Sequence, residues 1–172
     1  KHYLDFLSGI AVVGLGHANP VIADAIADQA RTLVHVSNFF ANTTATKAAV
    51  AIADLMRDAG AGDGQVFFCN SGAEANEAAI KLSRKFGGRG RHVMVSAYGS
   101  FHGRTLGALA LTGQPAKHEV FQPMPDGFRY CEFGDIASLE AQIDGTVSAV
   151  MLESIQGEGG VIPADPAYLQ AV

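Results

Sequence analysis

The chain has 172 residues, of which 48% are hydrophobic and 17% charged, and this balance suits one globular domain or a large piece of a two-domain protein. A formal net charge of -5 and the lack of a basic block argue against nucleic acid as a partner. No apolar stretch approaches the roughly 18 residues of a membrane span, and the first residues lack a secretory signal pattern, so we expect a cytosolic protein without a membrane partner.

The cysteines and the two ends of the chain carry further information. Cys69 and Cys131 lie far apart in apolar contexts, without the spacing of metal ligands, so we expect two reduced structural thiols and no metal site. The chain starts without Met, and residues 163–172 resemble the first turns of a helix. We therefore expect a fragment of a longer protein.

The first third of the chain predicts a short strand followed by two amphipathic helices. Residues 3–7 are a short apolar run, typical of a strand, and residues 9–19 form a glycine-rich connection. Asn19 is a typical helix cap, and the proline after it suits the first helical position. A second helix, capped by Thr43 or Thr44, should end at the GAGDG turn.

The remainder alternates between apolar runs and helical periodicity, so the fold class is α/β. Residues 66–69 and 92–96 are β-rich and flank a helix over 72–86, an order that fits a right-handed crossover onto a parallel sheet. Residues 147–152 predict a further buried strand. Glu77 and Lys81 are expected to pair on the exposed face of the helix. Its expected buried stripe consists of Ala75, Ala78, Ala79, Leu82 and Phe86.

One glycine pattern fails as a dinucleotide fingerprint. Gly14 and Gly16 follow an apolar run and precede a helix, as a dinucleotide-binding turn would. The third glycine position holds Asn19, and the span from Asp28 to Asp54 has no acidic residue for the ribose. The glycines are better explained by a tight connection than by a nicotinamide or flavin site.

Three segments carry candidate chemistry. Free amides at Gly72 and Ala73 would bind a phosphate at the start of a helix, although an ordinary capped helix start explains the same pattern. Phe101 offers a flat face and Arg104 a guanidinium fork for a carboxylate, although an aromatic residue in a loop often packs on its neighbours. Glu153 ends a predicted strand, where a carboxylate tends to face the ligand crevice.

The segments NSGAEANEAAIK, FHGRTLGALALTGQ and QGEGG resemble the class III aminotransferases, which are pyridoxal phosphate enzymes of fold type I. GIAVVGLGHANP, HVSN and FFCNSGAEANEAA are most similar to the branch that acts on acetylornithine. The resemblance covers essentially the whole chain. It implies a truncated large domain with a mostly parallel sheet between helices. Residues 1–40 would be an N-terminal segment, and residues 41–172 part of the large domain that binds pyridoxal 5'-phosphate.

The resemblance also implies residue roles. The implied cofactor-binding residues are Ser71, Gly72, Ala73, Phe101, His102 and Glu153. The first three would hold the cofactor phosphate, Phe101 would stack on the ring with His102 beside it, and Glu153 would lie near the cofactor. Arg104 would bind the substrate α-carboxylate. Glu158 corresponds to a glutamate that in relatives masks another arginine when dicarboxylates bind.

The implied reaction moves an amino group from N-acetylornithine, or a similar terminal amine, to 2-oxoglutarate in arginine biosynthesis, and the implied assembly is a homodimer. Ornithine, succinylornithine and 4-aminobutyrate stay open as donors, and so does an inactive cofactor-binding fragment. The family's aspartate for the pyridinium nitrogen and its Schiff-base lysine come after QGEGG. None of the five lysines of this chain has that context, so none is expected to be catalytic. Ser154 also departs from the pattern, because relatives usually have proline there.

Overall fold

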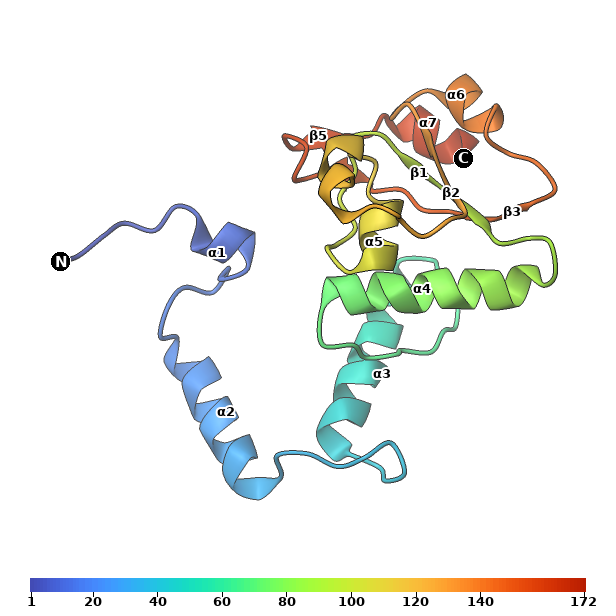
Figure 1. Cartoon of the computed structure of the whole chain (residues 1–172). Helices are drawn as coiled ribbons and strands as arrows, with labels where there is room; N and C mark the ends of the chain where they lie inside the picture. The colour runs from blue at the N-terminus through green and yellow to red at the C-terminus, as the bar shows by residue number, and fades with distance from the viewer. The chain divides into compact units, whose positions relative to one another are not determined.

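The computed structural model describes all of residues 1–172, and the chain divides into two compact units, Lys1–Val66 (unit 1) and Phe67–Val172 (unit 2). Figure 1 shows the elements along the chain. The expected division at residues 40 and 41 stays a prediction. No helix combines the length and the apolar character that crossing a membrane requires.

Unit 1 contains three helices, α1 (Ser8–Ala11), α2 (Pro20–Thr32) and α3 (Thr43–Asp58). Asn19 caps α2 as predicted, because its side-chain oxygen accepts a hydrogen bond from the Val21 amide at 3.0 Å. The predicted cap of α3 at Thr43 or Thr44 is wrong. Both threonines lie inside the helix, and the Asn42 side chain one residue earlier accepts from the Thr44 amide at 2.9 Å.

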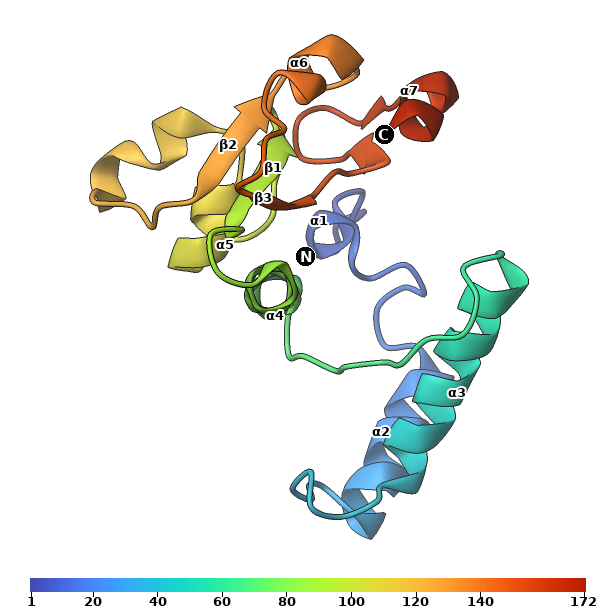
Figure 2. The same cartoon turned by 90° about the vertical axis from the view of Figure 1, so that its right-hand side faces the viewer.

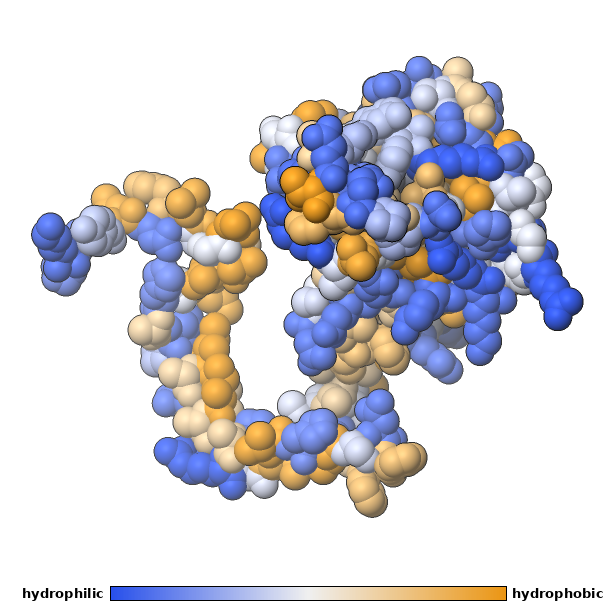
Figure 3. All heavy atoms as spheres, in the orientation of Figure 1, coloured by the Kyte–Doolittle hydropathy of each residue, from blue (hydrophilic) through white to orange (hydrophobic).

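The predicted strand over residues 3–7 is also wrong. A strand needs hydrogen bonds from a neighbouring strand, and these residues pair with none. No residue of unit 1 is buried. Apolar side chains instead cover much of its surface, as Figure 3 shows. Phe6, Ile26 and Leu55 are examples of such exposed side chains.

Unit 2 is built on a three-stranded parallel sheet, which confirms the α/β prediction. The strands are β1 (Val93–Ala97), β2 (Phe128–Cys131) and β3 (Val147–Val150), in the order β2-β1-β3. β1 is central and buried along its whole length, with Val95 opposite Arg129 of β2 and Val150 of β3. Its burial on both faces explains the continuous apolar run in the sequence.

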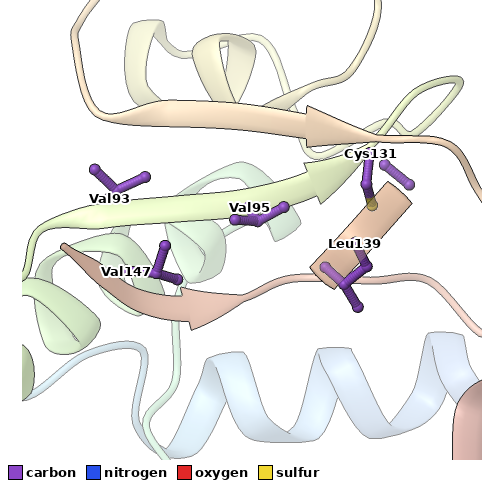
Figure 4. Close-up of a cluster of buried hydrophobic side chains, with 6 residues drawn as sticks. Val93, Val95, Cys131, Leu139 and Val147 are labelled. Carbon is purple, nitrogen blue, oxygen red and sulfur yellow. The ribbon is translucent and has the colours of Figure 1, made fainter. Parts of the chain in front are cut away.

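Helices cover both faces of this sheet. α4 (Gly72–Gly87) and α5 (Leu106–Leu111) pack on one face, where Ile80, Met94 and Leu111 form a buried cluster. α6 (Ile136–Glu140) supplies Leu139 to the cluster on the other face, which Figure 4 shows together with Val95. In Figure 2 α4 is seen nearly along its axis, on one side of the strands, and α6 lies on the other.

Short elements complete unit 2. Two 3-10 turns, η1 (Pro115–Lys117) and η2 (Glu119–Phe121), precede β2. β4 (Ile155–Gln156) and β5 (Ile162–Pro163) form an antiparallel hairpin after β3. The chain then enters α7 (Pro166–Ala171), which confirms the helix expected there.

Two expectations around α4 are wrong. Residues 66–69 form no strand, because no other strand of the structure pairs with them, so the expected crossover between two strands is not formed. The expected apolar stripe is not buried either, since Leu82 and Phe86 are 67% and 87% exposed. Ile80 is the one buried residue of the helix. Much of the stripe lines an open groove of about 650 Å³ beside Phe67.

Candidate functional site

The residues nominated for the site all lie in unit 2, and they gather near the carboxyl ends of two neighbouring strands. β1 runs into the loop that holds Phe101, and β3 runs toward Glu153. Because adjacent parallel strands end at the same edge of a sheet, the two segments meet there. The Phe101 amide donates a hydrogen bond to Oε2 of Glu153 at 3.3 Å.

The start of α4 presents free main-chain donors. Oγ of Ser71 accepts from the Glu74 amide at 3.2 Å, and the Glu74 carboxylate accepts from the Asn70 amide at 2.8 Å, in an arrangement close to a capping box. The amides of Gly72 and Ala73 donate to no acceptor of the protein. Two free amides at the positive end of a 16-residue helix fit a phosphate group.

Open space beside Gly72 allows such a group to approach. A Cβ built on Gly72 would meet no atom within 4 Å. A phosphate group could therefore approach the main chain at Gly72 from the side where a Cβ would lie. The donors and the space together fit the phosphate of the cofactor that the sequence resemblance implies.

Gly103 joins the aromatic loop to this helix start. Its φ angle is +131°, and a Cβ at this position would lie 2.8 Å from Cβ of Ala73. A larger residue would clash and would also be strained in this conformation. The contact joins the segment that holds Phe101 and Arg104 to the start of α4, although the two segments are separated in the sequence.

Two cationic side chains lie against the half-buried Phe101 ring. Cζ of Arg104 is 5.7 Å from the ring centroid, and Nζ of Lys117 is 5.2 Å from it. Both distances fall within the range of cation–π contacts. An anionic ligand placed beside the ring would therefore meet positive charge.

Glu158 lies in the loop between β4 and β5 and is held by two side chains. Its Oε1 atom accepts from Nζ of Lys117 at 2.6 Å, and its Oε2 atom accepts from Nε2 of Gln114 at 2.9 Å. These hydrogen bonds, that of Lys117 above all, lower the pKa of Glu158. In contrast, burial raises the pKa of Glu153, and the hydrogen bond from the Phe101 amide opposes that shift.

His102 lies in the interior, unlike the adjacent Phe101. Its side chain is 6% exposed, its amide donates to Oγ1 of Thr112 at 2.9 Å, and its carbonyl accepts from Nδ2 of Asn76 at 2.6 Å. Burial lowers the pKa of His102 to about 4, so its ring is neutral at pH 7. Nε2 is buried without a hydrogen-bond partner. The role of His102 toward the cofactor stays a prediction.

The sequence reasoning missed three residues of this region. Gln114 is the last residue of the segment FHGRTLGALALTGQ, but nothing in the local pattern linked it or Lys117 to Glu158. Glu77 was expected to pair with Lys81 on the exposed face of α4. Its carboxylate instead accepts from the Thr105 hydroxyl at 2.5 Å. These contacts join segments far apart in the sequence, so helical spacing cannot reveal them.

The chain is similar to known proteins along its whole length. The family model for class-III aminotransferases matches residues 1–172. The acetylornithine aminotransferase of Gloeobacter violaceus is 47% identical over 174 residues, which cover 99% of this chain and 42% of the relative. The acetylornithine aminotransferase of Xanthomonas axonopodis pv. citri is 49% identical over 178 residues, covering 100% of this chain and 43% of the relative.

Solved structures show the same likeness. N-acetylornithine aminotransferase from Stenotrophomonas maltophilia matches 98% of this chain and 41% of its own, with a TM-score of 0.76 and 38% identity. An ornithine aminotransferase from Toxoplasma gondii, which has partial occupancy of PLP at its active site, covers 98% of this chain and 40% of its own, with a TM-score of 0.87 and 31% identity. The chain spans about two fifths of the length of the curated relatives it matches.

Proposed function

Because the chain belongs to the class-III aminotransferases, we propose that it forms the part of a pyridoxal phosphate-dependent aminotransferase that holds the cofactor and the substrate carboxylate. The observation that carries this proposal is the contact of Gly103 with Ala73. It joins a helix start with two free amides to the segment that holds an aromatic ring and an exposed arginine. A phosphorylated aromatic cofactor and a carboxylate substrate need that combination.

We propose N-acetylornithine, or a similar terminal amine, as amino donor and 2-oxoglutarate as acceptor. The relatives with 47% and 49% identity are acetylornithine aminotransferases, which supports this donor. The likeness to the Toxoplasma gondii enzyme keeps ornithine as the second candidate. Relative turnover of the two amines by the complete protein would distinguish them.

In this mechanism each part of the site has one task. The amides of Gly72 and Ala73 bind the cofactor phosphate, and Ser71 holds the helix start in the conformation that presents them. The Phe101 ring would help to hold the cofactor, and Glu153 fixes the Phe101 main chain by accepting a hydrogen bond from its amide. When bound, pyridoxal phosphate would supply an electron sink for the reaction.

Arg104 binds the substrate carboxylate through its guanidinium, which offers two parallel donors. Glu158 stays ionised in the hydrogen bonds of Lys117 and Gln114 and borders the same region. None of the five lysines of this chain is assigned the covalent step. We propose that the lysine that performs the covalent step belongs to the part of the complete protein that corresponds to the remaining length of the relatives.

Two substitutions in the complete protein test the cofactor and substrate assignments. Gly72→Asp places a carboxylate beside the phosphate site, and like-charge repulsion of about 1 to 4 kcal/mol should weaken pyridoxal phosphate binding about fivefold or more. Arg104→Lys should leave cofactor binding unchanged and raise the KM for 2-oxoglutarate about tenfold, because lysine loses the bidentate fork. Spectroscopic titration and steady-state kinetics measure the two effects.

Matched controls exist on the same chain. Gly145 also has open space around it, so Gly145→Asp should leave cofactor affinity unchanged. Arg89 is exposed, and Arg89→Lys should leave KM unchanged. Unchanged cofactor affinity in Gly72→Asp would contradict the phosphate site, and a normal KM in Arg104→Lys would mean that another residue holds the carboxylate.

We further propose a cytosolic homodimer without nucleic-acid or membrane partners. The acidic composition supports the absence of a nucleic-acid partner. The homodimer is supported by unit 1, in which no residue is buried and large apolar side chains face outward. Sedimentation of the complete protein as a monomer at micromolar concentration would contradict the dimer.

A further inference from the structure

We propose that Glu77 is a positioning residue that holds Arg104 in place for the substrate carboxylate. Glu77 lies on α4, and its hydrogen bonds go to Thr105 and Ala108 rather than to the proposed phosphate site or to Phe101. It would act through Thr105 and the start of α5, which directly follow Arg104 in the chain. The inference rests on the proposed role of Arg104 and adds a residue that controls it.

The carboxylate of Glu77 caps the start of α5 from a different helix. Its Oε1 atom accepts from Oγ1 of Thr105 at 2.5 Å and from the Ala108 amide at 3.0 Å. Thr105 occupies the N-cap position of α5, but its side chain forms no capping hydrogen bond there. Glu77 therefore takes the place of the usual local cap, and hydrogen bonds to an ionised acceptor are stronger than neutral ones.

Gly107 provides the space for this carboxylate. A Cβ built on Gly107 would lie 2.5 Å from Oε2 of Glu77 and 2.9 Å from its Cδ atom. Any larger residue would push the carboxylate away from Thr105. The glycine and the glutamate therefore form one matched contact between α4 and α5.

The residues around Arg104 are tied to α4 at three successive points. The His102 carbonyl accepts from Asn76, Gly103 packs against Ala73, and the Thr105 hydroxyl donates to Glu77. The Arg104 side chain in this stretch is exposed and lies against the Phe101 ring, with no hydrogen bond to α4.

The carboxylate of Glu77 does not neutralise Arg104. No arginine or lysine nitrogen lies within ion-pair distance of it, and its Oε1 atom is engaged by Thr105 and Ala108. The guanidinium thus remains available to a ligand. The main chain of Arg104 is fixed by the contacts with α4 on both sides. This division of tasks is what a carboxylate-binding arginine requires.

The test compares Glu77→Ala and Glu77→Gln in the complete protein loaded with pyridoxal phosphate. Glu77→Ala should raise the KM for 2-oxoglutarate about tenfold and weaken binding of glutarate, an unreactive dicarboxylate, by the same factor. Cofactor affinity should stay within about twofold. Glu77→Gln keeps an acceptor for the Thr105 hydroxyl and should restore most of the loss. Glu140→Ala, an exposed glutamate of α6, is the matched control.

A second variant and a second readout cover the case in which Glu77→Ala does not fold. Thr105→Val removes the donor and leaves Glu77 in place, so it should raise the same KM severalfold. Hydrogen exchange of the apoprotein gives an independent measure, since the Ala108 amide should exchange about tenfold faster in Glu77→Ala.

The outcomes separate this inference from the function on which it rests. If the wild-type protein binds pyridoxal phosphate and turns over, but glutarate affinity is unchanged in both Glu77→Ala and Thr105→Val, the positioning role is overturned alone. A wild-type protein that binds no pyridoxal phosphate contradicts the proposed function and this inference with it. Equal losses of cofactor and glutarate affinity would also overturn it, because they indicate general disruption.

Discussion

Units 1 and 2 contain helices of comparable length and capping, but only unit 2 has a buried core. α3 and α4 each span 16 residues and begin at a side-chain cap. α3 buries no residue, whereas α4 places Ile80 against Met94 of the sheet. Helix formation is therefore specified locally in both units, while burial depends on a sheet that the chain supplies only to the second.

The largest expected difference between the units concerns core truncation. Leu111 is fully buried, so Leu111→Ala should destabilise unit 2 by about 2 to 5 kcal/mol. Leu55 of α3 is 70% exposed, and Leu55→Ala should cost less than about 0.5 kcal/mol in residues 1–172. Native-state hydrogen exchange measures both. A comparable cost at Leu55 would mean that unit 1 is packed more tightly than its exposure indicates.

The second difference concerns pH and follows from His102 in unit 2. Its folded pKa of about 4 lies below the unfolded value of 6.5, so the unfolded chain binds a proton first as the pH falls. The contribution of neutral His102 to the free energy of unfolding is fully present above pH 6.5. It is lost as the pH falls from 6.5 to 4, by about 3 kcal/mol in total.

Urea unfolding at several pH values measures the slope of the free energy of unfolding against pH. His102→Gln should flatten the slope, whereas His35→Gln, at an exposed position of unit 1, should leave it as it is. An unaltered slope in His102→Gln would assign the pH dependence to other groups.

The smallest expected effect concerns the N-terminal cap of α3, which tests whether helix formation in unit 1 is specified locally. Asn42→Ala removes the cap of α3 and should cost about 1 kcal/mol of helix stability, seen as lower helicity by circular dichroism. Thr43→Ala is the matched control and should cost less, because Thr43 lies inside the helix. A larger loss in Thr43→Ala would restore threonine as the cap.

The elements predicted correctly are those with strong local patterns. α2, α4, β1 and β3 each have a clear cap, period or apolar run. The run at residues 66–69 has strand-like composition, but strand formation also requires a partner. β2 was not predicted, because Arg129 interrupts its apolar residues, and α5 was not predicted because six residues are too few to establish a helical period.

The contacts of the candidate site also divide into those that the sequence predicts and those that it does not. The meeting of Phe101 and Glu153 follows from the rule that parallel strands end at one edge, and the hydrogen bond between them agrees with it. The contacts of Glu77 with Thr105 and of Lys117 with Glu158 depend on the directions of side chains that leave separate elements. A period read along the sequence contains no information about such directions.

The parallel pairing of β1 has a consequence for the order of folding. Its partners β2 and β3 follow it by several tens of residues, so the entropy of closing long loops must be overcome before the sheet can form. The hydrogen bonds of α4 are local and can form much earlier. The helix start that carries the free amides of Gly72 and Ala73 can therefore exist first, and the Phe101 side is completed last.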